Sequence, residues 1–343
     1  MQGQGRRPAR PTIRDVADRA DVALGTVSRV LNGFSNVGAD VQDRVRQAIA
    51  ELGYQPNLSA RSMRTQATGL VACVVPDIQN PLYAAVLGAA EATLSAAGYT
   101  LLVVSSGWQV AQELTLVEAL ARRRVDGVVA VPTDESDVAL QTAYAALGVP
   151  IVLVEREMPM PFAGLVATDQ SGSMRMATGM LLDLGHRRVA LMSSPAYNRS
   201  GRERVAGYRA AHEERGVTMD PALLFDEGQV AEVVRRGAAA LLSLASPPTA
   251  LITAGDRSLG DVLRALRNFG RRIPDDISVI SWGDGDLAEL FSPPISAIRY
   301  DAGEIGREAA RMLLDALRGD HATHRRLVRA ELVMRQSCLP FRP

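Results

Sequence analysis

Apolar residues recur at helical spacing through the first 65 positions of the chain. The apolar positions of the first helix share one face at i, i+3, i+4 and i+7: Ile13, Val16, Ala17 and Ala20. Thr12 precedes this face and is a residue type that caps helix N-termini. A second helix is expected after residues 21–22 and ends at Gly33, and a third spans residues 40–52. This segment therefore predicts a small helical unit.

From residue 69 onward, short apolar runs alternate with helical patterns. The apolar runs predict strands at residues 70–75, 100–104, 125–131, 150–154, 189–192, 250–253 and 277–282. The helical patterns occupy residues 82–97, 110–123, 136–146, 171–184, 202–215, 231–244, 258–269 and 302–318. Uniformly apolar strands between helices are typical of parallel sheets covered on both faces. Because the region is too long for one such sheet, we expect two doubly wound parallel-sheet subdomains with a cleft at the carboxyl ends of their strands.

The composition is that of a globular protein. Of its 343 residues, 47% are hydrophobic and 22% are charged, which excludes a disordered chain and allows a large core. The two cysteines, Cys73 and Cys338, form neither a disulfide framework nor a zinc site, as in a reducing compartment. No apolar stretch reads as a secretory signal or reaches the length of a membrane span. We therefore expect a cytoplasmic protein with no membrane partner.

The formal net charge is zero, which taken whole argues against a nucleic-acid partner. The distribution along the chain changes this conclusion. Residues 1–65 contain ten arginines against six acidic residues, so this segment carries +4 and the remainder carries −4. The basic charge therefore lies on the predicted helical unit. Residues 1–10 are interpreted as a disordered basic tail, with an arm that touches DNA phosphates as the alternative.

Catalytic motifs are absent from the sequence. No nucleophile elbow, phosphate loop or dinucleotide fingerprint occurs. The four histidines lack metal-ligand spacing with cysteine or acidic residues: His186, His212, His321 and His324. His186 follows a predicted helix and precedes a predicted strand, where a histidine caps or packs more often than it catalyses. The sequence therefore supports neither an enzyme nor a metal or cofactor.

The N-terminal helices have more functional content. The second helix directs a largely polar set of residues outward: Leu24, Gly25, Ser28, Arg29 and Asn32. Two helices joined by a tight turn, with such a face on the second, form a helix-turn-helix pattern whose second helix enters the DNA major groove. This pattern alone is weak, since any small helical bundle can produce it, and the local charge of the segment strengthens it.

Several strings then carry a family resemblance, in order along nearly the whole chain. In the N-terminal part they are residues 12–17 (Thr-Ile-Arg-Asp-Val-Ala), 26–32 (Thr-Val-Ser-Arg-Val-Leu-Asn) and 53–57 (Gly-Tyr-Gln-Pro-Asn). Farther along they are residues 76–81, 184–188, 273–279 and 293–294. The chain thereby resembles the lactose/purine repressor family of bacterial transcriptional regulators. The resemblance implies a helix-turn-helix domain at 11–55, a hinge helix and linker at 56–68, and an effector-binding and dimerisation core of periplasmic-binding-protein type at 69–343.

The resemblance also implies DNA contacts. Residues that reach bases are Leu24, Gly25 and Arg29, and of these Arg29 can form a bidentate contact to guanine. Phosphate contacts, which position the protein, are Thr12, Thr26, Ser28, Asn32 and Tyr54. The hinge would enter the minor groove with Asn57, Ala60 and Met63, where Met63 stands in place of the family's wedging leucine. Ala23 replaces the usual serine cap of the recognition helix, so we expect DNA itself to steady that helix.

Effector contacts are implied in the core. They fall at Leu82, Tyr83, Thr133, Glu155, Asn198, Ser200 and Arg204. Glycines at 255 and 283 replace two polar residues that often bind effector hydroxyls, and Trp282 or Asp284 are candidates to compensate. Because buried hydroxyls need partners, we expect an effector that is larger, partly apolar or differently oriented than a simple monosaccharide. A regulator that has lost control by small molecules is the weaker alternative.

We therefore expect a homodimeric, sequence-specific repressor of transcription. It would bind a near-palindromic operator in double-stranded DNA and respond to a small-molecule effector, a carbohydrate or related metabolite, in the core cleft. The competing class is a solute-binding receptor without DNA function, which the helix-turn-helix string and the lack of a signal sequence disfavour. An enzyme is the third alternative.

Overall fold

The computed structural model describes residues 11–31, 37–54, 67–226, 231–320 and 322–342. The expected basic tail at residues 1–10 lies outside the described residues, as do the expected DNA contacts Asn32, Asn57, Ala60 and Met63. The chain separates into two compact units, Met1–Thr68 and Gly69–Pro343. Among the described residues, no helix combines the length and apolarity needed to cross a lipid bilayer.

Three helices form the first unit: α1 (Ile13–Ala20), α2 (Leu24–Leu31) and α3 (Ala39–Leu52). A capping box starts α1, because the Thr12 hydroxyl accepts a hydrogen bond from the Asp15 amide while the Asp15 carboxylate accepts one from the Thr12 amide. Asp21 ends α1 in the left-handed conformation, with φ 51°. The helices share one core: Val16, Ala17, Ala20, Val27, Val45, Ala48 and Tyr54. The expected helical unit is confirmed.

Two six-stranded sheets form the second unit. The sheet of subdomain 1 has the order β11-β5-β4-β3-β1-β2, with β1 (Leu70–Val75), β2 (Thr100–Ser105), β3 (Gly127–Ala130), β4 (Ile151–Val154), β5 (Gly164–Thr168) and β11 (His324–Val328). The sheet of subdomain 2 has the order β12-β10-β9-β8-β6-β7, with β6 (Val189–Met192), β7 (Leu224–Phe225), β8 (Ala250–Ile252), β9 (Ser278–Trp282), β10 (Ser296–Tyr300) and β12 (Ala330–Val333).

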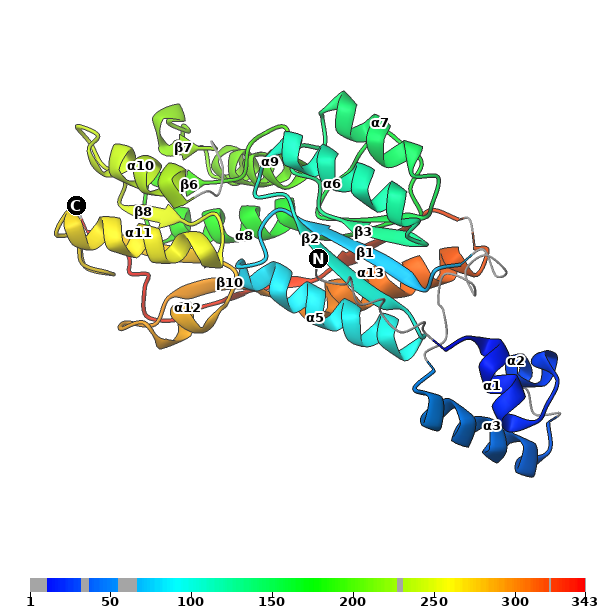
Figure 1. The fold of residues 1–343 in the computed structure, drawn as a ribbon. Helices are drawn as coiled ribbons and strands as arrows, with labels where there is room; N and C mark the ends of the chain where they lie inside the picture. Colours follow the sequence, from blue (N-terminus) through cyan, green and yellow to red (C-terminus); the bar gives the residue numbers. More distant parts are fainter. Residues whose placement is uncertain (1–10, 32–36, 55–66, 227–230, 321, 343) are drawn as a thin grey trace, which may run out of the picture. The chain divides into compact units, whose positions relative to one another are not determined.

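Helices cover both faces of each sheet (Figure 1). On subdomain 1, α5 (Pro81–Ala96) and α13 (Ala302–Leu317) pack on one face, and α6 (Val110–Arg123) and α7 (Val138–Ala146) pack on the other. On subdomain 2, α8 (Gln170–Asp183) and α9 (Arg199–Glu214) share one face, opposite α10 (Ala231–Leu242), α11 (Asp256–Asn268) and the short α12 (Asp286–Leu290). The expectation of two doubly wound subdomains is confirmed.

The chain crosses between the subdomains at three points, Asp169, Asp301 and Arg329. At the first two, an aspartate caps the helix that follows. The Asp169 carboxylate accepts a hydrogen bond from the Gly172 amide at 2.9 Å, and the Asp301 carboxylate accepts one from the Glu304 amide at 2.9 Å. These caps fix where α8 and α13 begin. Each subdomain is consequently assembled from segments that are far apart in the sequence.

The strands depart from expectation in three respects. β12 pairs antiparallel to β10, whereas parallel sheets were expected. β2 lies at a sheet edge and is not uniformly buried, since Val103 is 41% exposed. Five strands were not predicted: β5, β7, β10, β11 and β12. The sequence of β11 is His-Arg-Arg-Leu-Val, in which only Val328 is buried, so no apolar run marks it.

Candidate functional site

The outer face of α2 exposes Leu24, Gly25 and Arg29, the three residues expected to reach bases. Thr26 and Ser28, expected at phosphates, are half-buried on the same helix. Val27 is fully buried and anchors α2 on the core of the unit. The alternation of one buried and several exposed positions presents the Arg29 side chain to solvent. This is the geometry that a groove-reading helix requires.

The start of α2 differs from the start of α1. The Ala23 carbonyl accepts hydrogen bonds from the amides of Thr26 and Val27, at 2.8 and 3.3 Å. Ala23 therefore occupies the position of the cap, but its methyl side chain cannot accept from an amide. Tyr54, another expected phosphate contact, is 9% exposed and packs its ring in the core of the unit.

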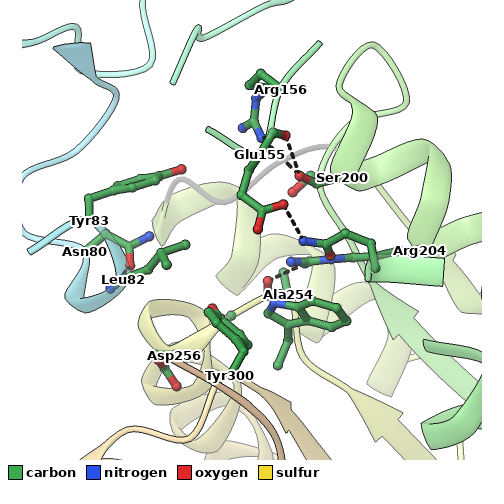
Figure 2. A pocket seen from close by; sticks show the side chains of 14 residues that line it. Asn80, Leu82, Tyr83, Glu155, Arg156, Ser200, Arg204, Ala254, Asp256 and Tyr300 are labelled. Atoms are coloured by element: carbon green, nitrogen blue, oxygen red, sulfur yellow. Dashed lines mark hydrogen bonds between the residues drawn. The ribbon is translucent and has the colours of Figure 1, made fainter. Parts of the chain in front are cut away.

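In the second unit, a cavity lies between the subdomains at the carboxyl ends of their strands, where a cleft was expected. About 460 Å³ of space lies between the protein atoms here, part of it open to solvent. Subdomain 1 lines it with Asn80, Leu82, Tyr83, Glu155 and Arg156. Subdomain 2 and the crossings line it with Gln170, Ser194, Ser200, Arg204, Ala254, Gly255, Asp256, Trp282 and Tyr300. Figure 2 shows Tyr83 and Leu82 across the space from Arg204, with Glu155 between them.

Arg204 is held rigidly on the subdomain 2 side of the cavity. Its Nε donates to Gln170 Oε1 and its Nη1 donates to the Ala254 carbonyl, both at 2.6 Å. The guanidinium lies 4.0 Å from the centre of the Trp282 ring, a cation–π contact. Burial lowers the pKa of Arg204 to about 10, so the side chain stays charged at neutral pH. It therefore offers a fixed, fork-shaped donor to a ligand.

Glu155 sits beside the first crossing in a conformation rare for its residue type. Its φ is 57°, in the left-handed region, where a side chain is tolerated only when its surroundings hold it. The carboxylate accepts from the Thr168 amide and from the Gln170 side-chain amide, each at 2.8 Å. Gln170 thus joins Glu155 of subdomain 1 to Arg204 of subdomain 2.

Arg156 closes another part of the cavity wall. Its Nε donates to the Pro132 carbonyl at 3.1 Å, and its Nη1 donates to the Glu155 carbonyl at 3.0 Å and to the Ser200 hydroxyl at 3.1 Å. The Ser200 hydroxyl in turn donates to the Glu155 carbonyl at 3.1 Å. Because Ser200 belongs to α9, this cluster also spans the two subdomains.

Six of the nine expected effector contacts line the cavity: Leu82, Tyr83, Glu155, Ser200, Arg204 and Trp282. The other three do not, and the structure shows what occupies them. Thr133 bonds Ser106 through its hydroxyl, and Asn198 donates to the Thr133 carbonyl. The Asp284 carboxylate accepts hydrogen bonds from Arg299 and Arg335, so its oxygens are already engaged within the protein.

The glycine at position 283 has a structural reason. Its φ is 97°, and a Cβ there would lie 2.5 Å from both carboxylate oxygens of Asp256. The Asp256 carboxylate accepts from the Gly285 amide at 3.2 Å, and burial raises its pKa to about 6. A carboxylate from α11 thus occupies the space that a side chain at 283 would need. A polar group that was not named among the candidates to compensate, the Asp256 carboxylate, therefore lies at this place.

Sequence reasoning missed several lining residues, above all Arg156, Gln170 and Tyr300. Gln170 and Tyr300 flank the crossings at Asp169 and Asp301, so no local pattern places them in a cleft. A signal did exist for Arg156: an arginine directly after an apolar strand, at its carboxyl end, lies where α/β proteins bind ligands.

Two family models match the chain. Residues 12–57 match the bacterial regulatory proteins of the lacI family, and residues 178–338 match a periplasmic binding protein-like domain. The chain is 35% identical over 345 residues to the HTH-type transcriptional regulator CelR of Thermobifida fusca, covering 96% of this chain and 99% of the regulator. Among solved structures, a CelR–cellobiose complex matches with a TM-score of 0.72 at 32% identity, covering 96% and 100%. A lac repressor dimer bound to operator and the anti-inducer ONPF matches with a TM-score of 0.83 at 26% identity, again covering 96% and 100%.

Proposed function

Because the chain belongs to the lacI family of bacterial regulatory proteins, we propose that it represses transcription as a homodimer on a near-palindromic operator in the cytoplasm. The family consists of transcriptional regulators, and this chain is an effector-controlled DNA-binding member of it. In this proposal Arg29 reads a base, while Leu24 and Gly25 lie close to the bases without polar readout. Thr12, Thr26, Ser28 and Tyr54 contact phosphates. Asn32 does so too, whereas the hinge enters the minor groove with Asn57, Ala60 and Met63.

Control by an effector is supported by one observation above all: Gln170 is hydrogen-bonded to both Glu155 and Arg204. It joins the two subdomains through the wall of the cavity, so a ligand that contacts Arg204 or Glu155 must also act on the crossing between them. A ligand that binds one arrangement of the subdomains more tightly shifts the population toward that arrangement. The effector is a carbohydrate or related metabolite in this proposal, supported by the cellobiose complex of CelR.

The dimer surface of the proposal lies on α5 and β2, which are neighbours. Beside the exposed Glu91, α5 carries four small exposed residues: Ala84, Ala85, Gly88 and Ala92. Val103 adds an exposed apolar side chain on the free edge of β2. Small residues allow close helix approach, and a free strand edge invites pairing. The lac repressor dimer supports a dimeric assembly.

Selection of bound DNA from a random duplex library tests the function directly. We expect a near-palindromic consensus, enriched by the full chain and not by a chain lacking residues 1–68. Repeating the selection with cellobiose reports whether that sugar changes operator binding. A library that yields no consensus contradicts the proposal, and an asymmetric consensus contradicts the dimer.

A further inference from the structure

Two buried guanidinium groups line the cavity without an ion-pair partner. Arg156 is 3% exposed and Arg204 is 4% exposed. Their hydrogen bonds go only to neutral acceptors, namely backbone carbonyls, the Ser200 hydroxyl and the Gln170 side chain. Within the described part of the chain, no carboxylate reaches ion-pair distance of either group. The Glu155 carboxylate acts on Arg204 only from beyond that distance. A buried cation with no carboxylate in contact is costly, so an anion placed between the two groups would be stabilised.

The neighbouring arginine shows the difference. Arg199 is equally buried, at 7% exposed, yet its guanidinium lies 2.8 Å from the Glu203 carboxylate and 3.7 Å from the Glu155 carboxylate. Arg199 therefore has two counter-charges inside the protein. Arg156 and Arg204, which line the cavity, have none at contact distance.

The carboxylates of the cavity are already occupied. Both oxygens of Glu155 accept hydrogen bonds within the protein, and Arg199 balances their charge. The Asp256 carboxylate packs against Gly283 and Gly285 and accepts from the Gly285 amide. The cavity therefore presents cationic donors to a ligand while its acidic groups are engaged with the chain itself.

Helix N-termini add to this positive character. α9 and α11 begin at the cavity, where Ser200 and Asp256 lie in their first turns. Neither helix has a side-chain hydrogen bond at its cap. Uncapped first-turn amides and the helix dipole favour a negative charge nearby. Their effect points in the same direction as the two guanidinium groups.

From these contacts we infer that the effector is anionic: a small polyhydroxylated molecule whose carboxylate or phosphate is bound by Arg156 and Arg204. This inference rests on the proposed function, because it names the chemical class of the effector for the same cavity. Tyr83 supplies a flat apolar surface for the carbon skeleton of such a molecule, and Trp282 also lines the cavity, with Arg204 stacked on its ring.

The test compares matched neutral and charged probes on the full chain by isothermal titration calorimetry. Cellobiose is paired with cellobionate, and glucose is paired with glucuronate and with glucose 6-phosphate, so that carboxylate and phosphate sources are separated. We expect at least one charged probe to bind tenfold or more tightly than its neutral counterpart. Equal or tighter binding of the neutral sugars overturns the inference, and so does the failure of every charged probe to bind.

Variants then locate the charge preference. Arg156→Met and Arg204→Met should each lower the ratio of charged to neutral affinity at least tenfold, whereas Arg175→Met should leave it unchanged. Arg175 is a matched control because it lies on α8, exposed and paired with Glu214 at 2.9 Å. Thermal unfolding of each variant shows whether it is folded. A preference that survives in folded Arg156→Met and Arg204→Met contradicts the assignment.

Failure of this inference is distinguishable from failure of the proposed function. If the chain selects a palindromic operator and responds to cellobiose but not to cellobionate, the proposed function stands and the anionic effector is contradicted. If the chain binds a charged probe without any change in operator binding, the anion site stands and control of DNA binding by an effector is contradicted.

Discussion

Arg29 is the one long polar side chain on the exposed face of α2 that can read a base pair bidentately. Arg29→Ala should therefore cost about 1–3 kcal/mol on the selected operator and relax the preference at one base pair of each half-site. Competition binding against single-base operator variants measures this. Arg46→Ala is the control, since Arg46 is exposed on α3 and bonds Gln42 of its own helix. Equal weakening on operator and unrelated DNA would mean that Arg29 binds phosphate.

Asp256 gives the cavity a dependence on pH. Burial raises its pKa from 3.8 to about 6, so the folded chain holds this proton more tightly than the unfolded chain does. The contribution of Asp256 to the stability of the wild type therefore falls as pH rises from about 4 to about 6, and this loss is complete above 6. Asp256→Asn keeps an oxygen that can accept from the Gly285 amide and has no charge to bury.

Urea unfolding across pH checks this effect. Asp256→Asn should match the wild type near pH 4 and exceed it by up to about 3 kcal/mol above pH 6, from 1.4 kcal/mol per pH unit. The difference should be absent in Asp315→Asn, an exposed carboxylate on α13. A gap that does not grow with pH would show that Asp256 is not neutral in the folded state.

At the scale of single residues, the family resemblance predicted most of the cavity wall formed by subdomain 1 and a smaller part of the wall formed by subdomain 2. Glu155 could be expected because it directly follows an apolar strand, and Arg204 because the family resemblance places an effector contact near the start of its helix. Gln170 and Tyr300 could not be expected from the sequence. Gln170 follows β5 and Tyr300 ends β10, and both line the cavity because the chain crosses to the other subdomain at these two points. Asp256 was visible in the sequence, but its role depends on the missing side chain at Gly283, which is a tertiary contact.

At the scale of elements, α2 starts at Ala23 without a side-chain cap. Ala23→Ser should stabilise the first unit by about 0.5–1 kcal/mol, because a serine hydroxyl can accept from a free amide of the first turn. Hydrogen exchange of the α2 amides in the DNA-free chain measures this gain. Thr12→Ala, which removes the cap of α1, should shift the exchange of α1 in the opposite direction. Faster exchange of α2 in Ala23→Ser would contradict the cap.

Element prediction succeeded where the apolar pattern is local and failed where it is not. The buried strands β1, β3, β4, β6, β8 and β9 each stand out as apolar runs. β11 and β12 carry charged residues and are strands only because β5 and β10 offer a free edge. α9 begins three residues earlier than expected, and these residues include Ser200 of the cavity wall.

For the whole molecule, the proposed dimer surface makes a testable statement about Val103. Val103→Asp places a charge on the exposed edge of β2, where burial against a second copy would be costly. We expect the chain to sediment as a monomer and to lose at least tenfold in operator affinity. Val138→Asp is the matched control, because Val138 is 72% exposed at the start of α7. An unchanged dimer in Val103→Asp would place the interface elsewhere.

The three crossings at Asp169, Asp301 and Arg329 also determine when each subdomain can finish folding during synthesis. Subdomain 1 begins at β1 but receives α13 only after residue 301, and its core includes Ile305, Ala309 and Leu313 of that helix. Its edge strand β11 emerges later still. A nascent chain halted at the end of subdomain 2's α12 would therefore leave the apolar face beneath α13 open to water. The first subdomain to leave the ribosome is thus among the last parts of the protein to close, which is the interval in which a chaperone would have a surface to hold.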